Sequence, residues 1–229
     1  MRSEESQEDE MVTLDDVRSN MRAKSFIELS NQHLGEIGYT EHGQRHTSLV
    51  ASIARNVLIR LGHDERDAEL AAIAGYLHDI GNVVSRYNHG QSGPLIAMDI
   101  LKEMGMEDNE MGIVMSAIGN HEEDYGEPVN NVSAALMLAD KSDVHRSRVR
   151  NPDETKFDIH DRVNYAAERS FLRVSAKEKT ITLELTIDTR IAQVMEYFEI
   201  FLTRMKMCRK AAEYLGCRFV LIINDVVLL

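Results

Sequence analysis

Six histidine and aspartate residues occur in a pattern that could hold divalent metal ions. They lie near the ends, or on the inward faces, of several predicted helices in an acidic chain with nine histidines and a net charge of −12. Imidazole and carboxylate groups from different helices of a bundle can enclose a metal ion. A single buried histidine is more often structural, so the accumulation of these groups indicates a site. The residues are His46, His78, Asp79, His89, His121 and Asp140.

The elements that must position these residues are mainly helices, from about residue 14 to 145. Between Gly43 and Leu61, for example, Val50, Ile53 and Val57 recur on one face, and His46 lies one turn before Val50 on the same side. Short connections between such helices predict a compact bundle. The expected helices cover residues 14–34, 43–61, 64–78, 92–105, 108–120 and 132–140.

After residue 150 the pattern changes to strands and one long helix. Residues 181–187 alternate between apolar and polar side chains, as in a half-buried strand, and residues 169–174 would pair with them in a hairpin. Apolar residues then recur every three or four positions over 191–215, as in an amphipathic helix, and residues 218–229 form a β-rich run. We therefore predict a mainly α protein, in which a helical bundle is followed by a small α+β unit of β-β-α-β order.

The composition excludes several classes of protein. With 43% apolar and 28% charged residues the chain is globular, and its longest apolar stretch, residues 219–229, is too short to span a membrane. The first 12 residues are acidic and predict a disordered tail rather than a secretion signal. The two cysteines match no zinc motif, so we expect a cytoplasmic protein. The negative charge argues against duplex nucleic acid as a partner but permits a small phosphorylated substrate.

The histidine and aspartate motifs resemble those of the HD-domain metal-dependent phosphohydrolases. The signature of that family is a His on one helix, a His-Asp doublet at the end of a later helix, and a distal Asp. Here His46 lies in HGQRHTSLVASIA, the doublet of His78 and Asp79 in AAIAGYLHDIGN, and Asp140 in ALMLADKSD. The resemblance covers about residues 40–150 and implies the helical HD fold, whereas the C-terminal unit resembles no family that we can name.

The resemblance implies two divalent metal ions. A first ion would be held by His46, His78, Asp79 and Asp140. Asp79 would bridge to a second ion completed by His89 and His121, because family members with two further histidines before the last Asp commonly bind two metals. Iron or manganese is the expected metal, with magnesium, nickel, cobalt or zinc as other candidates. Some mononuclear relatives use nearby histidines to bind the substrate, so a single metal is the alternative.

The same resemblance implies hydrolysis of a phosphoester by a metal-bound hydroxide. Two metals about 3.5–4 Å apart lower the pKa of a bridging water and neutralise charge on the phosphoryl oxygens. His78, Asp79 and Lys141 are the expected catalytic residues, and the substrate would be a nucleotide or another small phosphorylated metabolite. The branch of the family that hydrolyses cyclic dinucleotides usually has a lysine where this chain has Asn82, so that substrate is disfavoured.

Basic residues near the predicted ligands suit a phosphate group. The segment that follows Asp140 includes Lys141 and Arg146 and has a local excess of positive charge. A solvated helix end, where the dipole favours basic residues, is the alternative. Arg45 would reach a substrate phosphate or remain at the surface, and His42 would line the pocket rim or face solvent. We therefore expect these four basic residues to bind the substrate.

Two other functions stay open at this point. An HD-fold diiron oxygenase uses the same ligands to oxidise its substrate with O₂, so ligand identity does not separate it from a hydrolase. A non-catalytic signalling or scaffold protein would usually have lost ligands, whereas this chain retains each matched position. We divide the chain into the tail (1–12), the metal-binding domain (13–150) and an α+β domain (151–229) for dimerisation or regulation. The apolar end of the chain favours a homodimer.

Overall fold

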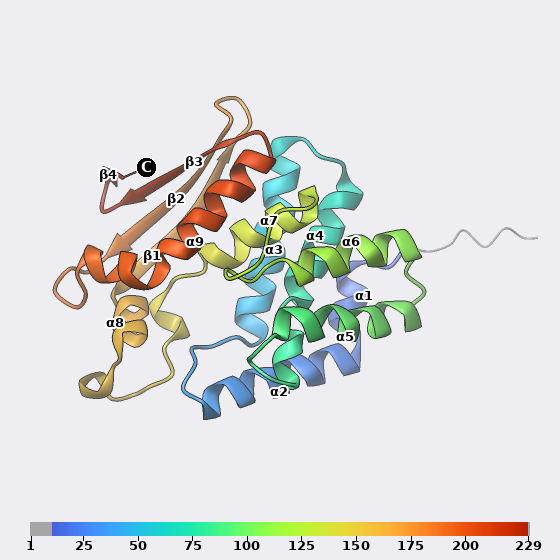
Figure 1. Ribbon diagram of the computed structural model, residues 1–229, viewed down its shortest axis with the longest axis horizontal. Helices are drawn as coiled ribbons and strands as arrows, with labels where there is room; N and C mark the ends of the chain where they lie inside the picture. The colour runs from blue at the N-terminus through green and yellow to red at the C-terminus, as the bar shows by residue number, and fades with distance from the viewer. Residues whose placement is uncertain (1–10, 229) are drawn as a thin grey trace, which may run out of the picture.

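The computed structural model describes residues 11–228. Helices form most of the chain up to residue 166, and a sheet with one long helix forms the rest (Figure 1). None of the described helices is long and apolar enough to cross a membrane. The elements of the first part are α1 (Leu14–Ser19), α2 (Met21–Glu36), α3 (Gln44–Leu61), α4 (Glu65–Leu77), η1 (Ile80–Val83), α5 (His89–Glu103), α6 (Asp108–Gly119), α7 (Asn131–Ser142), η2 (Arg146–Arg148), η3 (Glu154–Lys156) and α8 (Ile159–Ala166), where η denotes a 3-10 helix.

The centre of the bundle is formed by α3, α4 and α7, which pack against one another. α4 is rich in alanine and is buried on all sides from Leu70 to Leu77. Its Gly75 faces the backbone of α3, where an added Cβ would lie only 2.8 Å from the Cα of Ala51. A larger residue would therefore push α3 and α4 apart, and these are the helices that carry two of the predicted metal ligands.

The helix expected over residues 14–34 is divided into α1 and α2 at Asn20. The Asn20 side chain accepts hydrogen bonds from the backbone N–H groups of Arg22 and Ala23 and so begins a new helix. Asparagine is among the preferred residues for this position because its side chain replaces hydrogen bonds that the first helical turn lacks. The apolar periodicity continues across the break, so the pattern alone did not reveal it.

Among the described residues, the C-terminal unit is a four-stranded sheet with one long helix. The strands lie in the order β1 (Ala167–Ser175), β2 (Thr180–Ile187), β3 (Arg218–Ile223) and β4 (Val226–Val227), and α9 (Val194–Tyr214) connects β2 to β3. β2 is antiparallel to β1 and parallel to β3, and β4 returns antiparallel to β3. The mainly α fold with a β-β-α-β unit is thus confirmed. The final β-rich run is a hairpin, because the chain turns back on itself through Asn224 and Asp225, both with positive φ.

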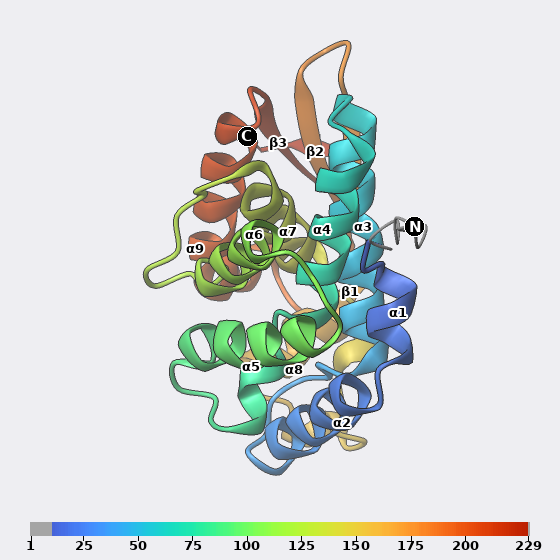
Figure 2. The ribbon, with the colours of Figure 1, turned by 90° about the vertical axis from the view of Figure 1, so that its right-hand side faces the viewer.

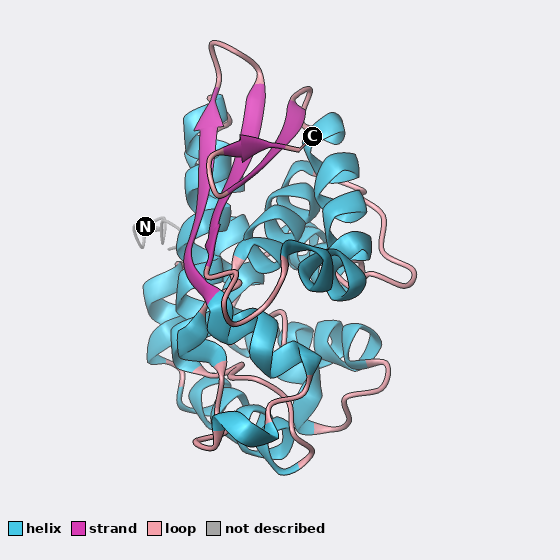
Figure 3. Cartoon of the chain, turned by 90° about the vertical axis from the view of Figure 1, so that its left-hand side faces the viewer, coloured by secondary structure: helices cyan, strands magenta, loops and turns pink. Residues whose placement is uncertain are grey.

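The two parts of the chain share one hydrophobic core. α9 packs against α7 of the bundle on one side and against β2 and β3 on the other. Tyr197, Phe201 and Met205 of α9 are buried in this contact. Figure 2 shows α9 beside α6 and α7, on the side of the bundle away from α1, and Figure 3 shows the strands gathered at one end of the molecule. The C-terminal unit is therefore placed directly against the helices that carry the predicted ligands.

The predictions about the two chain ends are only partly addressed by the structure. Residues 1–10 of the predicted acidic tail lie outside the described residues, whereas Val12 is buried in the core. At the other end, Val226 and Val227 of β4 and the following Leu228 are exposed apolar residues. The homodimer stays a prediction, for which these side chains offer an apolar surface.

Candidate metal centre

The predicted ligands meet at one place inside the bundle, where several helices begin or end. His46 lies in the first turn of α3, Asp140 lies in the last turn of α7, and His121 follows the end of α6. His78 ends α4 and Asp79 precedes η1. The side chains of the three histidines are almost completely buried. Helix ends suit this purpose because side chains can turn there toward a common point without crossing a helix.

His89, the sixth predicted ligand, is brought to the same point by a close contact between η1 and α5. α5 begins at His89, three residues before the Ser92 expected from the sequence, after Asn88 in a left-handed conformation (φ 59°). An added Cβ at Gly81 would lie 2.2 Å from the backbone oxygen of His89 and 2.7 Å from the nitrogen of Gly93. Only glycine at position 81 therefore allows the first turn of α5 to approach the His-Asp doublet so closely.

One group of ligand atoms comes from α3, α4 and α7. The Nε2 atoms of His46 and His78 lie 3.3 Å apart. Asp140 Oδ1 lies 3.4 Å from the first of these nitrogens and 3.7 Å from the second. The three atoms therefore surround a space of the size that one metal ion needs, since ligand atoms about 2.0–2.2 Å from a common ion lie a little over 3 Å from one another. We refer to them as the first ligand group.

A second group of ligand atoms lies beside the first and includes a residue that was not predicted as a ligand. His89 Nε2 lies 3.1 Å from His121 Nε2 and 2.7 Å from Glu122 Oε1. Glu122 Oε1 is also 3.4 Å from His121 Nε2. We refer to these three as the second ligand group. The sequence analysis missed Glu122 because it stands in an acidic run, although its position next to His121 was a usable signal.

Asp79 lies between the two groups. Its Oδ2 is 3.2 Å from His78 Nε2 and its Oδ1 is 3.3 Å from His89 Nε2. Asn82 donates from Nδ2 to Asp79 Oδ1 at 3.0 Å and fixes the orientation of the carboxylate. Within residues 11–228, Asp79 Oδ2 is a buried oxygen without a hydrogen-bond partner. A buried carboxylate oxygen of this kind requires an explanation, and a bound cation provides one.

The hydrogen bonds of the imidazole rings direct their Nε2 atoms to the centre. Nδ1 of His78, His89 and His121 lies 2.8, 3.1 and 2.6 Å from the backbone oxygens of Gly75, Arg86 and Ile118. A carbonyl oxygen only accepts, so each Nδ1 carries the hydrogen and Nε2 is left to bind a metal. His46 Nδ1 lies 2.7 Å from Asp143 Oδ2 and donates to it, so Nε2 of His46 is also left to bind a metal. The donor set therefore fits divalent metal ions.

The charges of the centre favour cations. Burial lowers the pKa of His78, but Asp79 and Asp140 outweigh it and raise this pKa to about 10. Burial also lowers the pKa of His89, but the contacts with Asp79 and Glu122 outweigh this effect and raise the pKa to about 9. Burial works against ionisation of Glu122, yet the hydrogen bond from His89 lowers its pKa to about 2. In the absence of metal, protons on the imidazoles thus supply part of the positive charge that the carboxylates attract.

Two further ion pairs stabilise the first ligand group. Asp143, which is buried, accepts from His46 and also from Arg45 Nη2 at 2.7 Å. Lys141 is buried as well, and its Nζ lies 2.7 Å from Asp140 Oδ2 and 3.1 Å from Glu123 Oε1. Lys141 thus contacts a metal ligand directly and does not reach the surface. Neither Asp143 nor Glu123 was predicted, because short-range patterns do not show which acids will face a ligand.

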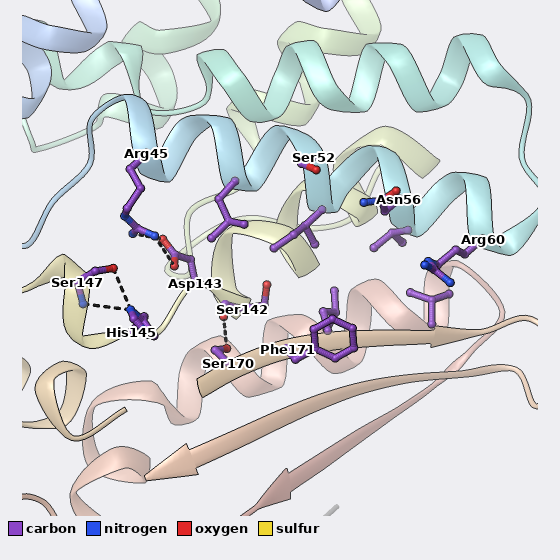
Figure 4. Close-up of a pocket in the computed structure, with 15 residues that line it drawn as sticks. Arg45, Ser52, Asn56, Arg60, Ser142, Asp143, His145, Ser147, Ser170 and Phe171 are labelled. Carbon is purple, nitrogen blue, oxygen red and sulfur yellow. Dashed lines mark hydrogen bonds and ion pairs between the residues drawn. The ribbon is translucent and has the colours of Figure 1, made fainter. Parts of the chain in front are cut away.

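The other predicted substrate-binding residues lie in different places. Arg45 points toward Asp143 at one end of a cavity of about 490 Å³ between α3 and β1 (Figure 4). Arg146 pairs with Glu168 at 3.0 Å. His42 is near the metal centre, with its ring centroid 5.4 Å from that of His46. The structure therefore brings His42 and Lys141 to the centre and places Arg45 and Arg146 outside it.

A second cavity, of about 390 Å³, lies next to the metal centre and joins the two parts of the chain. Its wall from the bundle includes His42, Arg86 and Glu123, while α8 and α9 contribute Asn164 and Arg204 among others. Asp140 and Glu122 are the ligands with partly exposed side chains, 12% and 17% respectively. The metal centre is thus open toward solvent on one side, as catalytic metal sites require.

Comparison with known proteins agrees with this geometry. The family model described as "HD domain" matches residues 43–145. An uncharacterized protein of Methanocaldococcus jannaschii is 28% identical over 208 residues, covering 80% of this chain and 79% of that protein. Ribonuclease Y of Staphylococcus epidermidis is 30% identical over 134 residues, which are 54% of this chain but only 24% of the ribonuclease. No solved structure matches the chain significantly. Residues 43–145 of this chain therefore match the HD domain, and the buried His and Asp groups fit a metal site of that domain.

Proposed function

We propose that this protein is a metal-dependent phosphohydrolase that cleaves a small phosphoester at a centre of two divalent ions. The observation that supports this most strongly is the pair of adjacent ligand groups with Asp79 between them. Sites with two metals are typical of enzymes that cleave phosphoesters. Iron and manganese suit a mixed His and carboxylate ligand set, with magnesium, nickel, cobalt and zinc as further candidates.

When bound, the ions would supply an activated water as the nucleophile and would neutralise charge on the phosphoryl oxygens. The protein's own residues have three tasks. His46 and His78 would hold one ion through Nε2, and their rings are oriented by Asp143 and by a backbone oxygen. Asp79 contributes one oxygen to each ligand group. Lys141 neutralises Asp140 and keeps its Oδ1 directed to the centre.

The size of the cavity beside the centre favours a small substrate. A cavity of about 390 Å³ has the size of an ordinary small-molecule site. Its polar lining suits a phosphorylated metabolite or a nucleotide better than an apolar ligand. The net charge of −12 gives no general attraction to a nucleic-acid backbone. We therefore place a small phosphoester before a polymer as the substrate class.

A second candidate is the hydrolysis of an RNA phosphodiester. It is favoured by the similarity to ribonuclease Y, whose name states its activity. The match to that protein from Oceanobacillus iheyensis covers 44% of this chain and 18% of the ribonuclease, so it concerns the HD region and not the whole enzyme. An oxygenase with two iron ions is a third reading, because its ligands would be the same.

One experiment separates these functions. The protein is reconstituted with Mn²⁺ or Fe²⁺ and incubated with nucleoside monophosphates, other small phosphomonoesters and a single-stranded RNA oligonucleotide, with and without oxygen. Release of inorganic phosphate from a small ester, independent of oxygen, is the expected result. Cleavage of the RNA alone would select the second candidate, and turnover that requires both iron and oxygen would select the oxygenase. Asp79→Ala serves as the inactive control.

A further inference from the structure

The C-terminal unit contributes to the cavity beside the metal centre, and its Arg204 has an unusual environment. Arg204 lies on α9, and its Nε is 2.9 Å from Glu123 Oε1. The guanidinium carbon lies 4.4 Å from the ring centroid of Phe201 on the same helix. These two contacts hold the planar group in one orientation. The Nη1 and Nη2 groups have no hydrogen-bond partner within residues 11–228, and a quarter of the side chain is exposed in the cavity.

Arg86, which comes from the bundle, has a similar arrangement. Its guanidinium carbon lies 5.2 Å from the ring centroid of Tyr39, and Nη1 is 3.6 Å from Glu122 Oε1. Nη1 also lies 3.0 and 3.1 Å from Nδ1 and Nε2 of His89. Its side chain is also one quarter exposed, and it lines the same cavity as Arg204. Glu122 and Glu123 are consecutive in the chain, so the two arginines are each held by one of two neighbouring acids beside the metal ligands.

The positive charge of these two arginines is not cancelled by the acids that hold them. Glu123 also contacts the ammonium group of Lys141 at 3.1 Å. Glu122 belongs to the second ligand group and would share its negative charge with a metal ion. By contrast, Arg148, the third arginine of the cavity, donates to the backbone oxygens of Asp143 and Glu41 and is buried. Among the described arginines of this cavity, Arg204 thus keeps both Nη groups for a ligand, and Arg86 keeps Nε and Nη2, since its Nη1 faces His89.

We propose that Arg86 and Arg204 together bind the phosphate group of the substrate, and that this substrate is a phosphomonoester. The inference rests on the proposed function. A terminal phosphate carries up to two negative charges and three oxygens without a second ester bond, so it can accept hydrogen bonds from two guanidinium groups while it faces the metal centre. An internal phosphodiester has one charge and two such oxygens, and it would leave part of this donor set unused. The C-terminal unit is then a part of the active site and determines its specificity through Arg204.

The part of the wall that α8 contributes agrees with a small polar group attached to the phosphate. α8 contributes His160, Asp161 and Asn164 to the cavity. Such side chains accept and donate hydrogen bonds to hydroxyl groups, as a sugar offers. The substrate class is therefore a phosphomonoester with a compact polar body, such as a sugar phosphate or a nucleoside monophosphate.

The test measures the binding of inorganic phosphate to the full chain reconstituted with Mn²⁺, by titration calorimetry. Arg204→Ala and Arg86→Ala should each weaken phosphate binding by about tenfold or more, with the Mn²⁺ content unchanged. Arg204→Lys should restore the affinity only in part, because lysine lacks the planar pair of donors. Arg209→Ala is the matched control, since Arg209 is exposed on the same helix and lies outside this cavity. Dimethyl phosphate, a diester with one charge, should bind more weakly than phosphate to the unmodified protein.

Several results would overturn the proposal. Unchanged phosphate affinity in Arg204→Ala would show that the metal ions alone hold the anion. Equal or tighter binding of dimethyl phosphate would contradict the assignment of a monoester. Loss of Mn²⁺ from Arg204→Ala would make Arg204 a structural residue. If phosphate failed to bind the unmodified, Mn²⁺-loaded protein, both this inference and the proposed function would fall. Phosphate binding that depends on Arg86 and Arg204, in a protein that hydrolyses no ester, would support the phosphate site and refute only the proposed function.

Discussion

The two ligand groups of the metal centre differ in what stabilises them. In the first group, His46 is oriented by the buried carboxylate of Asp143, and Asp140 is paired with the buried Lys141. In the second group, Nδ1 of His89 and Nδ1 of His121 each face a backbone oxygen instead of a carboxylate. A carboxylate that accepts from the far nitrogen of a ligating histidine makes that histidine a stronger ligand. We infer that the first group binds its metal more tightly and that the second ion exchanges more easily.

The Asp79 carboxylate should matter most, because it lies between the two ligand groups and contacts both. We expect Asp79→Ala to remove bound metal from both groups and to lower kcat by about 10³-fold or more. Helicity should change little, since the Asp79 side chain packs against polar groups and not within the apolar core. Metal analysis, circular dichroism and a phosphate-release assay check the three parts. A variant with nearly normal turnover would show that the site is wrongly assigned.

Removing one histidine from each group in turn should show which ion each group binds and how tightly. We expect His121→Ala to retain about one ion per chain, and His46→Ala to lose the tightly bound ion and most of the activity. The ratio of metal to protein after dialysis, measured for both variants side by side, is the test. If His46→Ala kept its metal while His121→Ala lost it, the order of affinities would be reversed.

Asp143 offers a finer test of the same difference. Asp143→Asn keeps the size of the side chain but replaces a charged acceptor of the His46 hydrogen with a neutral one. The affinity of the first group should fall by about 10- to 100-fold, and that of the second group should stay the same. Competition with a metal chelator measures both affinities. An equal loss in the two groups would mean that the variant disturbs the bundle in general.

The last test concerns the dependence of metal affinity on pH. The pKa of His78 is raised to about 10 and that of His89 to about 9, so in the metal-free protein both imidazoles are protonated at neutral pH. Metal binding must displace these protons, and the affinity should therefore rise as the pH increases from 6 to 8 (about tenfold per pH unit for each proton released). Calorimetry in buffers with different heats of ionisation counts the protons. A metal affinity independent of pH would show that Nε2 of His78 and of His89 carries no proton in the metal-free protein.

How much of the molecule could be predicted from its sequence depends on whether the signal lies within one segment or in contacts between distant segments. His46, His78, Asp79 and Asp140 lie in local strings that are specific to a family, so these ligands and the helical fold were predicted. The strands were predicted from the alternation of Ile181 to Ile187. In each case the signal lies within one short segment.

The residues that were missed depend on contacts between distant segments. Asp143 contacts His46 across 97 positions of the chain, and Arg204 reaches Glu123 only because α9 packs on the bundle. Arg45 was expected near a phosphate but pairs with Asp143 instead. No local pattern shows which of many charged residues the tertiary fold will bring to the site: of the basic run after Asp140, Lys141 lies at the metal centre and Arg146 pairs with Glu168.

The metal content of the gently purified protein, measured by elemental mass spectrometry, tests the two-metal centre most directly. Two adjacent ligand groups with a shared Asp79 predict about two iron or manganese ions per chain, of which one is lost first on dialysis. One ion or fewer, persisting after reconstitution with excess metal, would contradict the second ligand group and would make His89 and His121 contacts for the substrate.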